Sequence, residues 1–121
     1  MLCPHHDIKI VQRSNRQSAV AAAAYQSGER LFSEYDQKQK YYAEKRGIVH
    51  TEIMLPPHAP PEYADRNTLW NAAEAVEKQW NSQLARRIVL AIPREIPRSQ
   101  HAGLIRDYCR EFFVSKGMIA D

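Results

Sequence analysis

Hydrophobic and polar residues alternate over several short stretches of the chain, and this alternation predicts strands. Residues 6–12 alternate with Ile8 and Ile10 on one face. Residues 48–55 alternate in the same way, and residues 87–92 form a third apolar stretch that a proline closes. The pattern therefore predicts three strands.

Helical patterns separate these strands. An alanine-rich helix is expected over residues 17–30, where Ser14 or Asn15 could cap its start and Gly28 would end it. A second helix is expected over residues 65–83, with one apolar stripe on its inner face and Glu74 and Lys78 on its surface. The side chains of that stripe are Leu69, Ala73, Val76 and Trp80.

The last predicted helix begins near Pro97 and reaches Lys116, with Gly117 as its stop. Its inward-facing side chains would be Ile105, Tyr108 and Phe112. Residues 31–46 mix aromatic with charged side chains, and a hairpin and a loop both remain open for them.

This order of elements predicts an α+β fold with helices flanking a mostly antiparallel sheet. The 121 residues suffice for one compact domain, so no internal boundary is expected. The chain stops where another strand could begin. We interpret residues 1–121 as the N-terminal portion of a single domain.

The charge balance is mildly basic. Seventeen Lys and Arg against fourteen Asp and Glu give a net charge of +3, which permits a polyanionic partner without requiring one. No apolar run approaches the roughly 20 residues that span a membrane, and the N-terminus lacks the pattern of a secretory signal. A cytoplasmic location without a membrane partner is expected.

Spacing alone predicts no metal site. The two cysteines, Cys3 and Cys109, match no zinc or redox pattern. His50 and Glu52 would share a strand face and could bind or move a proton, although a solvated face is the favoured alternative. No HxH or HExxH pair occurs among the five histidines, which are His5, His6, His50, His58 and His101.

Tyr25 is the first candidate for chemistry. Four alanines precede it, and such small neighbours can leave a phenol ring accessible. A tyrosine nucleophile must lose its proton during attack, and nearby cations would favour the phenolate. The candidate DNA-binding residues are the cations that flank it, although on spacing alone a core tyrosine and a solvated charged surface are the favoured alternatives. They are Lys9, Arg13, Arg16 and Arg30.

Several stretches together resemble the opening of the MobA/MobL-type relaxases. They keep the same order over nearly the whole chain, and the longest combines the alanine run with Tyr25, Gln26, Ser27 and Gly28. The matching stretches are residues 8–11, 17–29, 34–36, 49–56 and 65–93.

The resemblance implies a relaxase of the HUH class, with Tyr25 at the position of the nucleophile. In that family the tyrosine attacks a phosphodiester at a plasmid's origin of transfer and leaves a 5′-phosphotyrosyl link and a free 3′-hydroxyl. Three histidines hold a divalent metal, Mg or Mn, that polarises the phosphate. The implied partners are origin DNA, accessory mobilisation proteins and a coupling protein.

The sequence departs from the family pattern in two places. The histidine cluster would lie beyond Asp121, and the strand that often carries acidic residues reads Arg87-Ile88-Val89-Leu90 here. The chain alone is therefore expected to hold no metal and to be inactive. A non-catalytic module that binds origin DNA or a partner, and a decayed remnant, are the alternatives.

Overall fold

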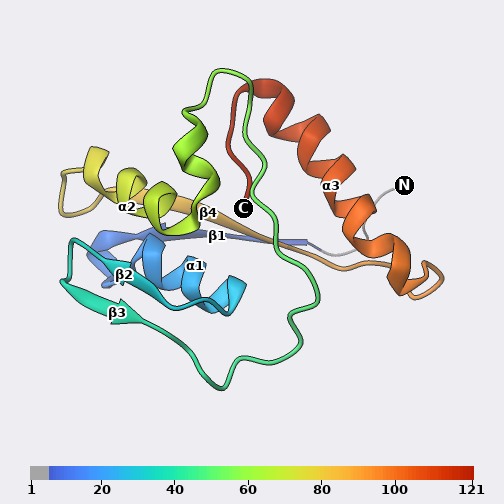
Figure 1. The fold of residues 1–121 in the computed structure, drawn as a ribbon, viewed down its shortest axis with the longest axis horizontal. Coiled ribbons are helices and arrows are strands. Elements are labelled where there is room, and N and C mark those ends of the chain that lie inside the picture. Colours follow the sequence, from blue (N-terminus) through green and yellow to red (C-terminus); the bar gives the residue numbers. More distant parts are fainter. Residues whose placement is uncertain (1–5) are drawn as a thin grey trace.

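The computed structural model describes residues 6–121 (Figure 1). Helices α1 and α2 lie in front of the paired strands β1 and β4 in this view, and α3 lies to one side. The predicted α+β class is confirmed. Cys3 and His5, which were named from the sequence, lie outside the described residues. The elements are β1 His6–Gln12, α1 Ala19–Ser27, β2 Leu31–Ser33, β3 Lys38–Lys40, α2 Arg66–Val76, β4 Gln83–Leu90 and α3 His101–Phe112. Short 3-10 helices span Arg13–Asn15, Pro61–Ala64, Arg98–Gln100 and Val114–Lys116.

Strands β1 and β4 form an antiparallel pair, which places Lys9 opposite Arg87. The first predicted strand therefore neighbours the one predicted near residue 87. Strand β4 begins earlier than predicted, at Gln83, because Leu84 already faces the core and Ala85 already pairs with Val11. The two arginines that follow interrupted the apolar pattern and hid this start.

The core is built around the small side chains of α1. The core consists of two clusters of buried residues, and Trp70 packs against both of them. Trp70 thereby joins α2 to α1 and to the sheet. Alanines allow the helix axis to approach its neighbours closely, since they add little bulk between the backbones. The buried residues of the two clusters are Val11, Ala19 and Leu84, and Val20, Ala23, Ala24 and Leu31.

Helix α1 starts later than predicted. Its N-cap is Ser18, whose Oγ accepts a hydrogen bond from Ala21 N at 3.1 Å. The predicted caps Ser14 and Asn15 lie instead in a short 3-10 helix. Gly28 ends α1 as predicted, with the left-handed φ of 75° that favours glycine at this position.

The hairpin alternative for residues 31–46 is confirmed, since β2 and β3 pair antiparallel. Two asparagines of α2 bind its edge as a neighbouring strand would. Asn67 Oδ1 accepts from Phe32 N at 2.7 Å, and Asn71 Oδ1 accepts from Glu34 N at 2.8 Å. The hairpin is thus fixed to α2 by its backbone.

The predicted strand at residues 48–55 is wrong. Within this segment only Met54 forms a strand-like bridge, with Ala120. The N–O distances of its two hydrogen bonds are 2.7 Å and 3.1 Å. Alternation is not sufficient for a strand, because a strand also needs a partner along its length. Among residues 6–121, this segment has one only at Met54.

The predicted second helix is too long. Helix α2 ends at Val76, and Val76 and Trp80 of the expected apolar stripe are each 73% exposed. Glu74, expected on the surface, is 5% exposed. Its Oε1 accepts hydrogen bonds from Ser18 Oγ at 2.8 Å and from Val20 N at 3.2 Å. The start of α1 therefore buries the carboxylate.

Helix α3 is shorter than predicted and packs loosely, although Gly117 does end the segment with a φ of 88°. No residue of α3 is fully buried, and Phe112, expected to face inward, is 46% exposed. Cys109 is half-buried, and burial raises the pKa of its thiol. No helix within residues 6–121 is long and apolar enough to cross a lipid bilayer.

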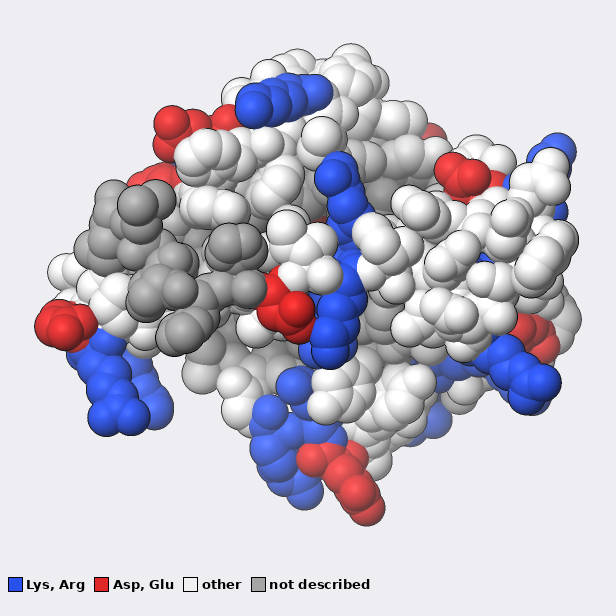
Figure 2. All heavy atoms as spheres, turned by 180° about the vertical axis from the view of Figure 1, so that it is seen from behind, with Lys and Arg blue, Asp and Glu red and all other residues white. Residues whose placement is uncertain are grey.

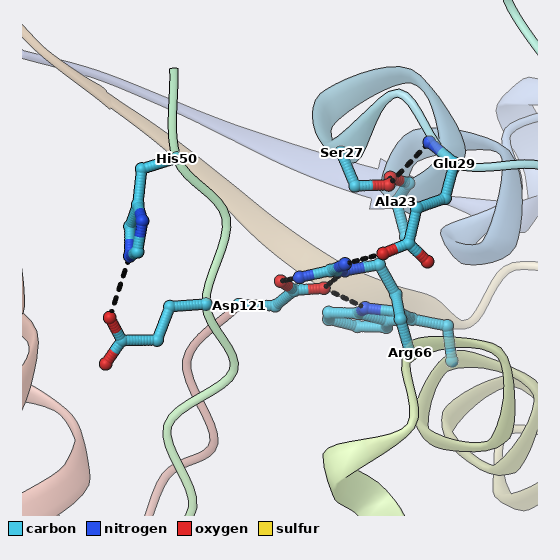
Figure 3. Close-up of polar contacts among 8 residues, drawn as sticks. Ala23, Ser27, Glu29, His50, Arg66 and Asp121 are labelled. Atoms are coloured by element: carbon cyan, nitrogen blue, oxygen red, sulfur yellow. Dashed lines mark hydrogen bonds and ion pairs between the residues drawn. The ribbon is translucent and has the colours of Figure 1, made fainter. Parts of the chain in front are cut away.

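Arg66 joins three parts of the chain through a buried ion cluster (Figure 3). Its guanidinium donates to Asp121 at 2.6 and 2.7 Å and also to Glu29, just after α1. Trp70 Nε1 donates to the same Asp121 carboxylate at 2.8 Å. The bond to Asp121 raises the pKa of Arg66, so the guanidinium stays charged at neutral pH.

We expect Arg66→Met to lower the free energy of unfolding by about 3 kcal/mol, because the buried Asp121 carboxylate loses its cation. Urea unfolding followed by circular dichroism measures the change. The matched control is Arg106→Met, which breaks a more exposed pair with Glu52 and should cost under about 1 kcal/mol. Equal losses in both variants would contradict the structural role given to the Arg66 cluster.

Candidate active site around Tyr25

Tyr25 lies near the end of α1 with its side chain partly exposed, as the alanine-rich sequence predicts. The residue is 40% exposed and lines an open cleft of about 660 Å³. No hydrogen bond joins its hydroxyl to another of residues 6–121. The hydroxyl is therefore available to a ligand in the cleft.

Two side chains from the segment after the hairpin hold the Tyr25 ring. The ring of Tyr42 meets it edge-on, with 5.4 Å between centroids, and Lys45 Nζ lies 4.5 Å from its centroid. Both contacts come from residues about 20 positions away, and nothing in the local sequence indicated them. They restrict the ring without occupying the hydroxyl.

The cleft carries more positive than negative charge. Five cationic side chains line it against two carboxylates, Asp36 and Glu74. Asp36 already pairs with Lys40 at 2.7 Å, and Glu74 is bonded to the start of α1. The cleft can therefore attract an anion such as a phosphate. The five cations are Lys9, Arg13, Arg16, Lys40 and Arg87.

Seen from the back of the molecule, Lys and Arg side chains form a line through the middle of the face and gather again below it (Figure 2). Acidic side chains lie beside both groups, which agrees with the modest net charge of +3. Positive charge on this face therefore lies in separate groups of side chains and does not cover the whole surface.

Arg13, one of the predicted DNA-binding residues, lines the cleft with its guanidinium already engaged. It donates to the carbonyl oxygens of Glu74 and Gln79, both at 3.0 Å, and to that of Glu77. These carbonyls lie at or just beyond the C-terminal end of α2, where a helix leaves acceptor capacity for a side-chain donor. The guanidinium also lies 4.5 Å from the centroid of the Tyr35 ring. Arg13 is therefore a fixed charge.

Of the other three predicted DNA-binding residues, two line the cleft and one does not. Lys9 and Arg16 line the cleft with Tyr25, and the Arg16 side chain makes no hydrogen bond or ion pair with the described residues. Arg30 lies away from the cleft, where it donates to Gln39 at 3.2 Å and covers the Tyr41 ring at 4.4 Å. The structure thus brings three of the four cations together with Tyr25.

Arg87 also lines the cleft, although it was not among the predicted DNA-binding residues. With the Gln26 amide turned so that its oxygen faces the donors, Gln26 Oε1 accepts from Arg87 Nη2 at 3.2 Å and from Nε at 2.5 Å. The signal that could have found Arg87 is its register opposite Lys9, which follows only once the strand pairing is known.

The described residues do not fit a divalent metal. Among residues 6–121 no group of three or more His, Cys, Asp or Glu side chains could hold one. His101 Nε2 bonds to the Ile96 carbonyl at 2.9 Å, and His50 Nε2 bonds to Glu52 at 2.9 Å. His5 lies outside the described residues, as does the side chain of His6. The cations beside Tyr25 would also repel a metal ion.

The predicted pair of His50 and Glu52 is present (Figure 3). Arg106 joins it from α3. Arg106 donates to both oxygens of Glu52 at 2.8 to 3.0 Å. Chiefly this hydrogen bonding, with a smaller effect from His50, lowers the pKa of Glu52 to about 2. The carboxylate therefore fastens α3 to residues 48–55 and stays ionised at neutral pH.

The sequence profile of the MobA/MobL family matches residues 17–121. This match covers most of the chain, and the chain belongs to the MobA/MobL family.

Curated relatives agree with this assignment. The conjugal transfer protein TraA of Agrobacterium fabrum is 36% identical over the whole chain, which spans 12% of that protein. The mobilization protein MobL of Acidithiobacillus ferridurans is 33% identical over 97% of the chain, which covers 30% of MobL. The probable mobilization protein MobA of Bifidobacterium longum is 31% identical over 96% of the chain. The chain thus spans a minor part of each relative's length.

A solved structure shares the fold. It was described as the molecular basis of vancomycin resistance transfer in Staphylococcus aureus and is 33% identical, with a TM-score of 0.88. The likeness covers 95% of this chain and 58% of that one. It confirms the relaxase-like α+β fold.

We expect acid to weaken the attachment of α3. Because the pKa of Glu52 is lowered from 4.5 to about 2, its contribution to stability is complete above 4.5 and is lost as the pH falls toward 2. Unfolding followed from pH 6 to pH 2 should show a smaller acid-induced loss for Glu52→Gln. Glu44→Gln, at an exposed position, serves as the control. An identical acid dependence in both variants would contradict the role of Glu52.

Proposed function

We propose that this chain is the nucleophile-bearing N-terminal part of a relaxase that nicks DNA at a plasmid's origin of transfer. The observation that carries the proposal is the partly exposed Tyr25 side chain, which lines a cationic cleft. Membership of the MobA/MobL family supports it, as do relatives named for conjugal transfer and mobilisation.

In the proposed reaction, Tyr25 Oη attacks the phosphorus of the scissile phosphodiester. The bond between phosphorus and the 3′-oxygen breaks, the phenol proton is lost, and the leaving oxygen takes up a proton to become a free 3′-hydroxyl. The 5′ end remains joined to Tyr25 as a phosphotyrosine. This link conserves a phosphodiester, so the strand can later be rejoined by the reverse reaction.

The cations around Tyr25 would bind the DNA backbone and offset the charge that builds up on the phosphate. Lys9 and Arg16 would contact phosphates directly, because their side chains are exposed or unpaired. Arg13 would contribute from a fixed position, and Arg30 would contact DNA that passes the β2–β3 hairpin. Accessory mobilisation proteins, a coupling protein and a cytoplasmic location remain predictions.

The metal that the family resemblance implies has no site among residues 6–121. The proposed reaction therefore includes no step through it, and any ligands would lie elsewhere in the polypeptide. A second candidate function, which the five cations of the cleft favour, is that the cleft binds origin DNA without cutting it.

We expect Tyr25→Phe to abolish formation of a covalent protein–DNA adduct while DNA binding stays within about twofold, because binding depends on phosphate contacts. The assay uses the polypeptide of the whole reading frame and single-stranded oligonucleotides that tile the neighbouring plasmid DNA. Adducts are measured on denaturing gels. The matched control is Tyr42→Phe, which removes the hydroxyl of the adjacent ring and should leave the adduct. An adduct that survives in Tyr25→Phe would exclude Tyr25 as the nucleophile.

We also expect the 121-residue chain alone to bind Mn²⁺ weakly, because two side chains at most converge near His50, and Arg106 competes for Glu52. Isothermal titration calorimetry with MnCl₂ should detect no site in the micromolar range. His50→Ala is the control and should not alter the titration. Tight binding of one ion per chain would mean that the histidines converge after all.

A further inference from the structure

Arg87 is a cation of the cleft that is tied directly to the helix of Tyr25. It lies on β4 and lines the same cleft as Tyr25. With its amide oxygen turned toward Arg87, Gln26, the next residue of α1, accepts two hydrogen bonds from the guanidinium, at 3.2 Å and 2.5 Å. The pair therefore fixes the guanidinium relative to the backbone that carries the phenol.

Arg87 has no acidic partner among residues 6–121. Of the two carboxylates in the cleft, Asp36 pairs with Lys40 and Glu74 is bonded to the start of α1. Gln26 is neutral, so it orients the guanidinium without cancelling its charge. A guanidinium carries five N–H donors in a planar fork, and Gln26 occupies two of them. The donors that remain, and the uncompensated charge, suit a phosphate group.

We propose that Arg87, oriented by Gln26, binds the scissile phosphate that Tyr25 attacks. This inference rests on the proposed function and adds a residue to it. Arg87 donates to the non-bridging oxygens and offsets the charge that develops on them, while the Tyr25 hydroxyl approaches from α1. Gln26 is a positioning residue, since it acts through Arg87. The exposed cations Lys9 and Arg16 hold the neighbouring backbone.

The test compares Arg87→Ala with Arg86→Ala in the full chain. Arg86 is the adjacent residue of β4, it does not line the cleft, and its Nη2 lies 3.8 Å from Met118 Sδ. Fluorescence anisotropy measures binding of a fluorescein-labelled single-stranded oligonucleotide at several salt concentrations. We expect Arg87→Ala to weaken binding about tenfold at low salt. The slope of log affinity against log salt should fall by about 0.7, the value of one phosphate contact. Arg86→Ala should change neither.

A second variant keeps the test decisive if Arg87→Ala folds poorly, which circular dichroism would reveal. Gln26→Glu retains the contact with Arg87 but cancels its charge, so it should weaken binding as Arg87→Ala does. Gln17→Glu adds the same charge elsewhere in the cleft and should weaken binding less. Arg87→Lys keeps the charge without the fork and should keep the salt slope while losing part of the affinity.

Equal binding by the Arg87 and Arg86 variants, or equal losses in the two glutamate variants, would overturn the role of Arg87. If the adduct assay still depends on Tyr25, the proposed function survives that result. If instead Arg87→Ala lowers the salt slope but no adduct depends on Tyr25, the proposed function fails. Arg87 would then bind a phosphate in a non-catalytic module, and the assignment to the scissile phosphate would fail with it.

Discussion

Helix α2 holds helix α1 at both ends, and the position of Tyr25 depends on this constraint. At the start of α1, the buried Glu74 carboxylate accepts hydrogen bonds from Ser18 and Val20. Just beyond its end, Glu29 pairs with Arg66. Between these two attachments the helix touches its neighbours mainly through alanines, which pack closely but resist sliding poorly. The polar contacts therefore set where the helix lies along its axis.

The cleft follows from the same arrangement. Because α1 lies across the β1–β4 pair, Gln26 comes close to Arg87 on the strand beneath it. The hairpin is bound to α2 through Asn67 and Asn71, so the segment after it passes Tyr25 and supplies Lys45. Residues from four parts of the chain thus surround one phenol, although none of them is adjacent in sequence except Gln26.

Local patterns predicted the features that depend on local forces. Strand β1, the glycine stop of α1 and the accessibility of Tyr25 follow from alternation, backbone conformation and small neighbours. The burial of Glu74 does not, because a carboxylate is buried only when another segment offers donors. The missing strand at residues 48–55 has the same cause, since pairing is a property of two segments. Arg87 was not predicted as a DNA-binding residue, because its place opposite Lys9 depends on the register of the two strands.

Arg13 illustrates a difference between kinds of positive charge. In the proposed function, Lys9 and Arg16 would give up rotational freedom when they bind a phosphate, and this loss would weaken their net contribution. The Arg13 guanidinium is already immobilised by the carbonyls at the end of α2 and by the Tyr35 ring. The position of this positive charge is therefore set before DNA would bind, and it would not shift with the DNA strand. A strand would therefore have to adapt to Arg13, which makes this side chain a fixed reference point for where the backbone can lie.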